Sequence, residues 1–106
     1  MPKEFVRVAG TGEVAPGKKK LVRLDDEQIL LVNLEGTYYA VDGVCPHALA
    51  SLNISQLDGD EIVCQVHGST FNVKSGEVLS PPAGEGLTVY PVRVEGDDLL
   101  VGPPDG

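Results

Sequence analysis

The sequence is short of cysteine, aromatic residues, positive charge and long apolar runs. Its 106 residues include 2 Cys, 2 Phe, 3 Tyr and no Trp. Two cysteines are too few for a small domain that depends on several disulfides, so ordinary aliphatic packing has to stabilise the chain. The longest apolar run, Ile29 to Val32, is far below the about 20 residues that a membrane helix needs. We therefore expect no bilayer span.

The start of the chain also lacks the features of exported proteins. Met1-Pro2-Lys3-Glu4 has neither the apolar stretch of a secretory signal nor a twin-arginine element. We expect a cytoplasmic protein.

Positive charge is scarce, with 8 basic against 16 acidic residues and a net charge of −8. Such a surface repels phosphate backbones, so we expect no nucleic-acid partner. It suits docking on a basic protein surface. Charge alone does not separate docking from a simple role in solubility, and solubility is the simpler interpretation.

What the sequence does have is turn residues and alternating apolar positions. The 13 Gly and 8 Pro separate short segments of period-two alternation, which predict an all-β domain, a small sandwich or incomplete barrel. Pro91 falls inside one segment, which predicts an edge strand or a bulge there. The expected strands are Glu4–Ala9, Lys19–Leu24, Gln28–Leu34, Thr37–Asp42, Glu61–Cys64, Thr70–Val73, Val78–Leu79, Thr88–Glu95 and Leu99–Val101.

The length fits one domain, residues 1–106, with an internal division. In the middle of the chain the strands become shorter and the loops longer. We therefore expect a β base made of residues 1–42 and 87–106, with a subdomain of about residues 43–86 inserted between its two parts.

All the cysteines and histidines of the chain lie in two short pairs. Cys45-Pro46-His47 is followed, after sixteen residues, by Cys64-Gln65-Val66-His67. An isolated Cys near a His is usually a buried apolar residue near a surface imidazole. Random placement would seldom use every Cys and His in this way, so the pairing indicates a metal site.

The ligand types leave zinc, iron and an iron-sulfur cluster open. Structural zinc usually takes a tight pair of cysteines and a separate pair of histidines. Here each pair presents a Cys first and a His second. That order suits two metals, with the two Cys on one and the two His on the other.

At this point the residues resemble the Rieske family, whose pattern is Cys-x-His, a spacer of fifteen or more residues, and Cys-x-x-His. The resemblance implies one two-iron, two-sulfur cluster, with Cys45 and Cys64 on the inner iron and His47 and His67 on the outer one. Two neutral imidazoles in place of thiolates make such a cluster easier to reduce, at about −150 to +300 mV instead of about −400 mV.

Residues 80–98 resemble the ferredoxins that serve ring-hydroxylating dioxygenases. They read Ser-Pro-Pro-Ala-Gly-Glu-Gly-Leu-Thr-Val-Tyr-Pro-Val-Arg-Val-Glu-Gly-Asp-Asp. By the same analogy Pro81 belongs to a loop that covers the cluster beside the two ligand loops.

Departures from other branches of the family narrow the prediction. The Rieske proteins of respiratory and photosynthetic complexes have a membrane anchor and a second Cys pair, whereas this chain has Ala50 and Val66 at the matching places. Ser69 matches a serine that in the high-potential branch donates a hydrogen bond to a cluster sulfur, and an ordinary turn residue is the alternative. Phe71 stands where that branch has a tyrosine.

The resemblance implies a one-electron carrier and not an enzyme acting by itself. We expect its partners to be a flavin-dependent reductase and a terminal oxygenase, and we expect a monomer. A small Rieske-fold subunit of a nitrite reductase is one alternative, although that group often lacks the metal ligands. A structural zinc module for protein interaction is another.

Overall fold

The computed structural model describes residues 4–24, 27–44, 56–63, 70–80 and 86–103. Within these ranges the chain forms eleven short strands and one 3₁₀ turn. They are, in order, β1 (Val6–Gly10), η1 (Thr11–Glu13), β2 (Lys19–Leu24), β3 (Glu27–Leu34), β4 (Thr37–Asp42), β5 (Gln56–Asp58), β6 (Glu61–Val63), β7 (Thr70–Asn72), β8 (Val78–Ser80), β9 (Val89–Tyr90), β10 (Val92–Glu95) and β11 (Asp98–Val101). No helix of the described ranges is long and apolar enough to cross a bilayer.

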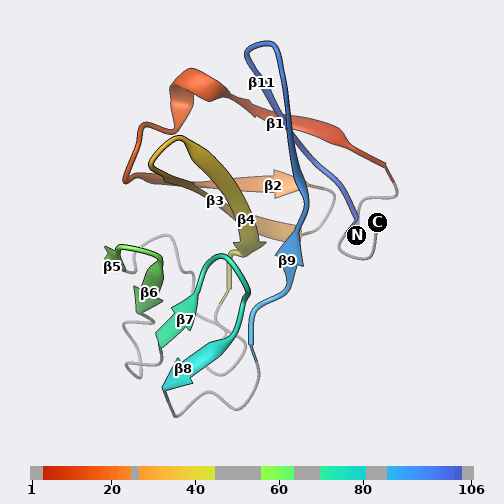
Figure 1. The fold of residues 1–106 in the computed structure, drawn as a ribbon. Helices are drawn as coiled ribbons and strands as arrows, with labels where there is room; N and C mark the ends of the chain where they lie inside the picture. Colours follow the sequence, from red (N-terminus) through yellow and green to blue (C-terminus); the bar gives the residue numbers. More distant parts are fainter. Residues whose placement is uncertain (1–3, 25–26, 45–55, 64–69, 81–85, 104–106) are drawn as a thin grey trace.

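The strands form three antiparallel sheets (Figure 1). The terminal sheet has the order β1-β11-β10, the central sheet β2-β3-β4-β9, and the distal sheet β5-β6-β7-β8. Figure 1 shows the distal sheet at one end of the molecule and the terminal sheet at the other, with the central sheet between them. The predicted all-β class is confirmed.

Strand β3 is buried on both faces because it lies inside the central sheet. Its consecutive side chains from Ile29 to Val32 are all 0% exposed. Ile29 and Leu31 enter one core, and Leu30 and Val32 enter the other. A strand covered on both faces needs an unbroken apolar run, so β3 lacks the apolar-polar alternation of a half-exposed strand.

The two cores lie on opposite faces of the central sheet. One joins it to the terminal sheet and contains Ala9, Val14, Val22, Leu24, Ile29, Leu31, Ala40, Tyr90, Leu99 and Val101. The other joins it to the distal sheet and contains Leu30, Val32, Val41, Ile62, Phe71, Val73 and Leu87. The distal sheet is therefore held to the rest of the protein by apolar packing as well as by the chain.

Most expected strands are observed with bounds that differ by one or two residues. The hairpin at Glu35-Gly36 is confirmed, because Leu34 pairs with Thr37 across it. Strand β5 was missed, since Gln56-Leu57-Asp58 contains no β-branched or aromatic residue. The last residue of the expected strand Glu61–Cys64 lies outside the described residues.

The single strand predicted over Thr88–Glu95 is wrong. Pro91 divides it into β9, at the edge of the central sheet, and β10, at the edge of the terminal sheet. Proline has no N–H to donate to a ladder, and the chain changes sheets at this residue. The expected edge position is confirmed for both strands.

Gly76 lies where the turn between β7 and β8 touches the chain that leads into β9. Its φ is +76°, and a Cβ atom there would clash with the carbonyl oxygen of Leu87 and lie 2.9 Å from Cγ2 of Val89. The Leu87 amide donates to the Gly76 carbonyl at 2.7 Å. Only glycine combines this backbone conformation with so close an approach.

We expect Gly76→Ala to lower the free energy of unfolding by about 3 kcal/mol, since the left-handed conformation costs about 1 kcal/mol and overpacking adds about 1–3 kcal/mol. Gly59→Ala is the matched control, because Gly59 has a φ of +61° and no atom within 4 Å of the added Cβ. It should cost only the conformational part. Urea unfolding followed by circular dichroism measures both, and equal losses would contradict the importance of the Leu87 contact.

Candidate metal centre

The six predicted site residues lie outside the described residues. They are Cys45, His47, Cys64, His67, Ser69 and Pro81. What the structure places is the strand ends to which their three chain segments, residues 45–55, 64–69 and 81–85, are attached.

One end of the distal sheet carries the attachment points of all three segments. Gln56 pairs with Val63, Val63 with Thr70, and Thr70 with Ser80. These four residues form a row across the sheet, which we call the loop edge. Paired Cα atoms in antiparallel strands are about 4.5–5.5 Å apart, so neighbouring points in the row are close in space.

The sequence order explains how each segment joins this row. Residues 45–55 directly precede Gln56. Residues 64–69 connect Val63 to Thr70, and residues 81–85 directly follow Ser80. The turns at Gly59-Asp60 and at residues 73–77 lie at the opposite end of the same sheet. The chain thus brings one end of each of the three segments, and both ends of residues 64–69, to one edge (Figure 1).

The loop edge rests on a well-packed sheet. Ile62 and Phe71 lie opposite one another on β6 and β7, and both are 0% exposed. Each is the immediate neighbour of a loop-edge residue, Val63 or Thr70. Phe71, noted in the sequence for replacing a tyrosine, therefore serves as a core side chain between the distal and central sheets.

Gly43 lies shortly before residues 45–55 and is bound to the central sheet. Its amide donates to the Gln28 carbonyl at 2.8 Å. A Cβ atom at this position would lie 2.6 Å from Cδ1 of Leu21 and 3.0 Å from the carbonyl group of Gln28, so any other residue would displace the Leu21 side chain and crowd the β3 backbone. The sequence analysis missed this residue, although a glycine two positions before Cys45 was a usable signal of close backbone approach.

Asp42 was also missed. Its carboxylate accepts a hydrogen bond from the Thr88 amide at 2.8 Å and another from the Tyr90 hydroxyl at 3.1 Å. Burial raises the pKa of the Tyr90 hydroxyl above its ordinary value, and the Asp42 charge raises it further, so the hydroxyl stays a donor. An acid at a strand end three residues before Cys45 was the available signal.

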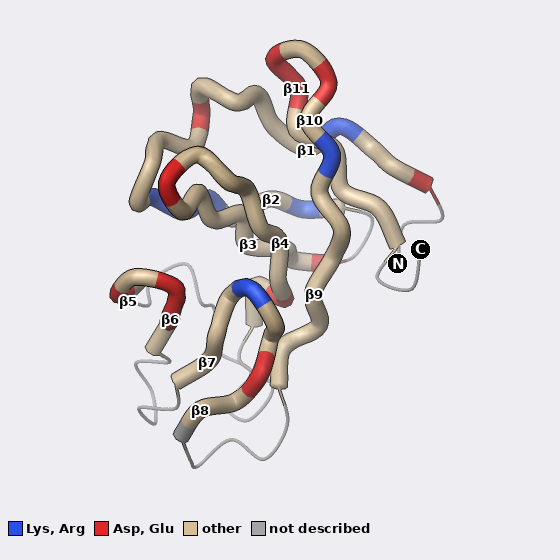
Figure 2. The backbone as a smooth tube through the Cα atoms, in the orientation of Figure 1, with Lys and Arg blue, Asp and Glu red and all other residues tan. Residues whose placement is uncertain are grey.

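Charge in the distal sheet gathers at the turns, away from the loop edge (Figure 2). Residues 56–80 include the acidic Asp58, Asp60, Glu61 and Glu77 and one basic residue, Lys74. No group of three or more His, Cys, Asp or Glu side chains suited to a metal ion occurs among the described residues.

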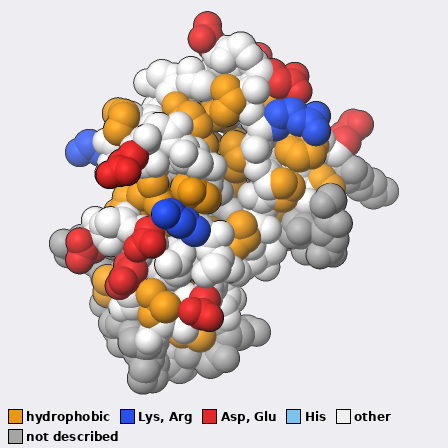
Figure 3. Space-filling model, viewed as in Figure 1, with side chains coloured by type: hydrophobic (Ala, Val, Ile, Leu, Met, Phe, Trp, Pro, Cys, Tyr) orange, Lys and Arg blue, Asp and Glu red, His pale blue; other side chains and the backbone are white. Residues whose placement is uncertain are grey.

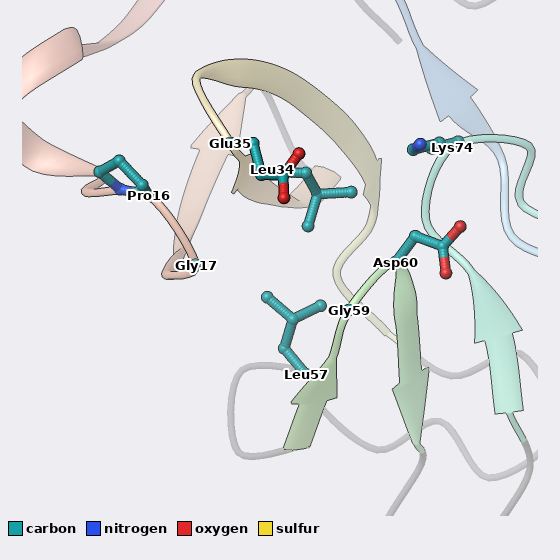
Figure 4. Close-up of a pocket in the computed structure, with 8 residues that line it drawn as sticks. All are labelled: Pro16, Gly17, Leu34, Glu35, Leu57, Gly59, Asp60 and Lys74. Atoms are coloured by element: carbon teal, nitrogen blue, oxygen red, sulfur yellow. The ribbon is translucent and has the colours of Figure 1, made fainter.

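The described residues also form an open groove between the β3–β4 hairpin and the β5–β6 hairpin (Figure 4). It is lined by Pro16, Gly17, Leu34, Glu35, Leu57, Gly59, Asp60 and Lys74. Gly59 and Asp60 form the turn of the distal sheet, so the groove lies at the end opposite the loop edge.

Solved structures with the same arrangement of strands are similar along nearly the whole chain. The ferredoxin of carbazole 1,9a-dioxygenase from Nocardioides aromaticivorans IC177 matches with a TM-score of 0.88 and 29% identity, over 95% of this chain and 99% of that one. A chain in the complex of reduced oxygenase and oxidized ferredoxin of carbazole 1,9a-dioxygenase matches with a TM-score of 0.87 and 31% identity, over 94% of each chain.

The sequence comparisons agree. The biphenyl dioxygenase ferredoxin subunit of Pseudomonas sp. (strain KKS102) is 39% identical over 98 residues, which cover 92% of this chain and 90% of that one. Residues 4–91 match the Rieske [2Fe-2S] domain family, so the match includes both Cys-His pairs. The resemblance predicted from the ligand pattern is confirmed. The chain belongs to the Rieske [2Fe-2S] domain family.

Proposed function

We propose that this protein is the ferredoxin component of a ring-hydroxylating dioxygenase system. It takes single electrons from a flavin-dependent reductase and delivers them to a terminal oxygenase. The observation that carries the proposal is its 39% identity, along nearly the full length of both chains, to a dioxygenase ferredoxin subunit. None of the similar proteins named above is a nitrite reductase subunit or a zinc module, the two alternatives.

Membership of the family implies one Rieske two-iron, two-sulfur cluster, and the donors of this chain fit it. Two thiols and two imidazoles are the set in which two His replace two Cys on one iron. When bound, the cluster accepts and releases one electron at a time. The chain acts as an electron-transfer component, as its ferredoxin relatives do, and not as a catalyst by itself.

We assign Cys45 and Cys64 to the inner iron and His47 and His67 to the outer iron. The division between the two irons follows the family pattern, and the loop edge supports a single site for both Cys-His pairs. Cys64 directly follows Val63, and the segment that contains Cys45 and His47 ends at Gln56, the pairing partner of Val63. Both Cys-His pairs therefore belong to segments attached at adjacent positions of one sheet edge.

Ser69 and Pro81 complete the proposed site. Ser69 directly precedes Thr70, and Pro81 directly follows Ser80. Thr70 and Ser80 are paired with each other at the loop edge. We assign to Ser69 a hydrogen bond to a cluster sulfur. Pro81 belongs to the segment that covers the cluster beside the two ligand segments.

The division into a base, residues 1–42 and 87–106, and a cluster-binding subdomain of about residues 43–86 stays a proposal. Its support is that the distal sheet is continuous in sequence, from Gln56 to Ser80. Strands from both parts of the proposed base, β4 and β9, pair in the central sheet.

Terminal oxygenase is the partner with direct support, because a similar chain occurs in a complex of oxygenase and ferredoxin. Acidic side chains over the β5–β6 hairpin and near β8 offer negative charge to a basic partner (Figure 3). Leu79 is 42% exposed next to Ser80, so an apolar contact is available at the loop edge. The reductase, a monomeric state and a cytoplasmic location stay predictions.

We expect two iron and two acid-labile sulfide per chain, because four ligands saturate both irons of one cluster. Cys64→Ser should lose the visible spectrum, whereas Val66→Ala, in the same segment but not a proposed ligand, should keep it. Elemental analysis and absorbance spectra measure this. One zinc and no iron in anaerobically prepared protein would contradict the assignment.

We expect Ser69→Ala to lower the midpoint potential, because a hydrogen bond to sulfur stabilises the more negative reduced state. A differential of about 1.4 kcal/mol corresponds to about 60 mV for one electron. The matched control is Ser75→Ala, since the Ser75 hydroxyl oxygen accepts from the Glu77 amide in the turn between β7 and β8. Protein-film voltammetry should show no change for the control, and an unchanged Ser69→Ala potential would make Ser69 a turn residue.

We expect electron transfer to a partner with a basic docking face to slow as salt rises, because the net charge of −8 contributes to steering. Stopped-flow rates with the terminal oxygenase at about 10 mM and about 150 mM ionic strength, where the screening length falls from about 30 Å to about 8 Å, measure the effect. Equal rates would show that charge has no part in docking.

A further inference from the structure

Asp42 is the last residue of β4, and its carboxylate is bound through both oxygens. Oδ2 accepts from the backbone amide of Thr88 at 2.8 Å, and Oδ1 accepts from the hydroxyl of Tyr90 at 3.1 Å. The Asp42 amide in turn donates to the Thr88 carbonyl oxygen at 3.0 Å. Three hydrogen bonds thus join Asp42 to the chain next to it.

These bonds lie where two paired strands separate. The ladder between β4 and β9 pairs Ala40 with Tyr90 and Val41 with Val89, and the next positions outward are Asp42 and Thr88. There the Asp42 carboxylate accepts a hydrogen bond from the Thr88 amide. The contact between the two chain segments therefore continues one residue beyond the last strand pair.

The position matters because of how the distal sheet is connected. Its four strands are consecutive in sequence, so the chain crosses between the central and distal sheets twice, from β4 to β5 and from β8 to β9. Asp42 stands at the start of the first crossing, and Thr88 stands at the end of the second. The carboxylate binds the two crossings to each other.

Other contacts hold each crossing to one of the sheets. In the first crossing the Gly43 amide donates to Gln28 on β3 at 2.8 Å. In the second the Leu87 amide donates to Gly76, in the turn between β7 and β8, at 2.7 Å. The Asp42 carboxylate links the two crossings to each other. The distance between them is therefore set at the point where both leave the central sheet.

Tyr90 gives this link a rigid support. It is 2% exposed and belongs to the core between the central and terminal sheets. A buried ring has little freedom, so its hydroxyl holds the carboxylate in one orientation.

We propose that Asp42 is a positioning residue for the metal centre. Its side chain sets the spacing between the two chain crossings. The first crossing leads from β4 into the segment with Cys45 and His47, and the second returns the chain to β9. The inference rests on the proposed function, in which Cys45 and His47 are ligands. Asp42 acts through this spacing and not as a ligand. Groups hydrogen-bonded directly to metal ligands commonly change metal affinity about 10- to 100-fold when removed, and a residue that acts one step farther out is expected at the lower end of that range.

The chemistry of the variants separates spacing from charge. In Asp42→Asn the amide oxygen accepts from the Thr88 amide, and the amide nitrogen donates to the Tyr90 hydroxyl, because a hydroxyl both donates and accepts. Both bonds survive without the negative charge. Asp42→Ala removes both, and Tyr90→Phe removes one.

The matched control is Asn33→Ala. Asn33 is 2% exposed, and its side chain also makes two bonds, donating to the Val14 carbonyl and accepting from the Gly36 amide, both at 2.8 Å. Those bonds lie at the far end of β3, away from the crossings. Asn33→Ala therefore lowers the stability of the base without touching the link between them.

The experiment measures cluster loss into excess chelator, the visible circular dichroism and electron paramagnetic resonance of loaded protein, and the unfolding temperature. We expect Asp42→Ala to lose its cluster about tenfold faster than wild type and to show an altered spectrum. Asp42→Asn and Asn33→Ala should stay within about twofold of wild type and keep its spectrum. If Asp42→Ala does not fold, Tyr90→Phe carries the test, with faster loss expected than for Asn33→Ala.

Three results would overturn the inference. Equal rates for Asp42→Ala and wild type would show that the spacing does not matter. Equal acceleration in Asn33→Ala and Asp42→Ala, with unaltered spectra, would show an effect of stability alone. Equal loss in Asp42→Asn and Asp42→Ala would assign the effect to charge. Wild-type protein without iron would instead overturn the proposed function, and this inference with it.

Discussion

Strand β3 supplies packing to both sides of the molecule. Its alternate side chains enter two separate cores, one shared with the terminal sheet and one shared with the distal sheet. Burial of each large aliphatic side chain contributes about 1.5–3 kcal/mol, so four consecutive buried residues supply a large part of the stability. The distal sheet has a fixed place because its core is continuous with one face of this strand.

Register then turns this packing into a base for the proposed metal centre. Because β5 to β8 pair side by side, Gln56, Val63, Thr70 and Ser80 come into one row. The core residues Ile62 and Phe71 hold the middle two strands of that row against the central sheet. A metal centre built from separate chain segments needs such a base, since its ligands have to be held at a defined spacing.

The same layout separates two kinds of surface. The loop edge lies at one end of the distal sheet, whereas the turns with Asp58, Asp60 and Glu77 lie at the other. A one-electron carrier benefits from this separation, because charge at the turns contributes to long-range steering while an exposed apolar side chain, Leu79, is available near the loop edge.

The sequence by itself determined the chemistry and the fold class. Two Cys-His pairs with their spacing identify the family without any coordinates, because ligand identity and order are local properties. Alternation and turn residues placed most strands for the same reason. The break at Pro91, the short strand β5, the double burial of β3 and the contacts of Gly43 and Asp42 were decided by the tertiary structure. Each depends on which segments lie side by side, and residues as far apart as Asp42 and Tyr90 become neighbours only when the sheets have formed.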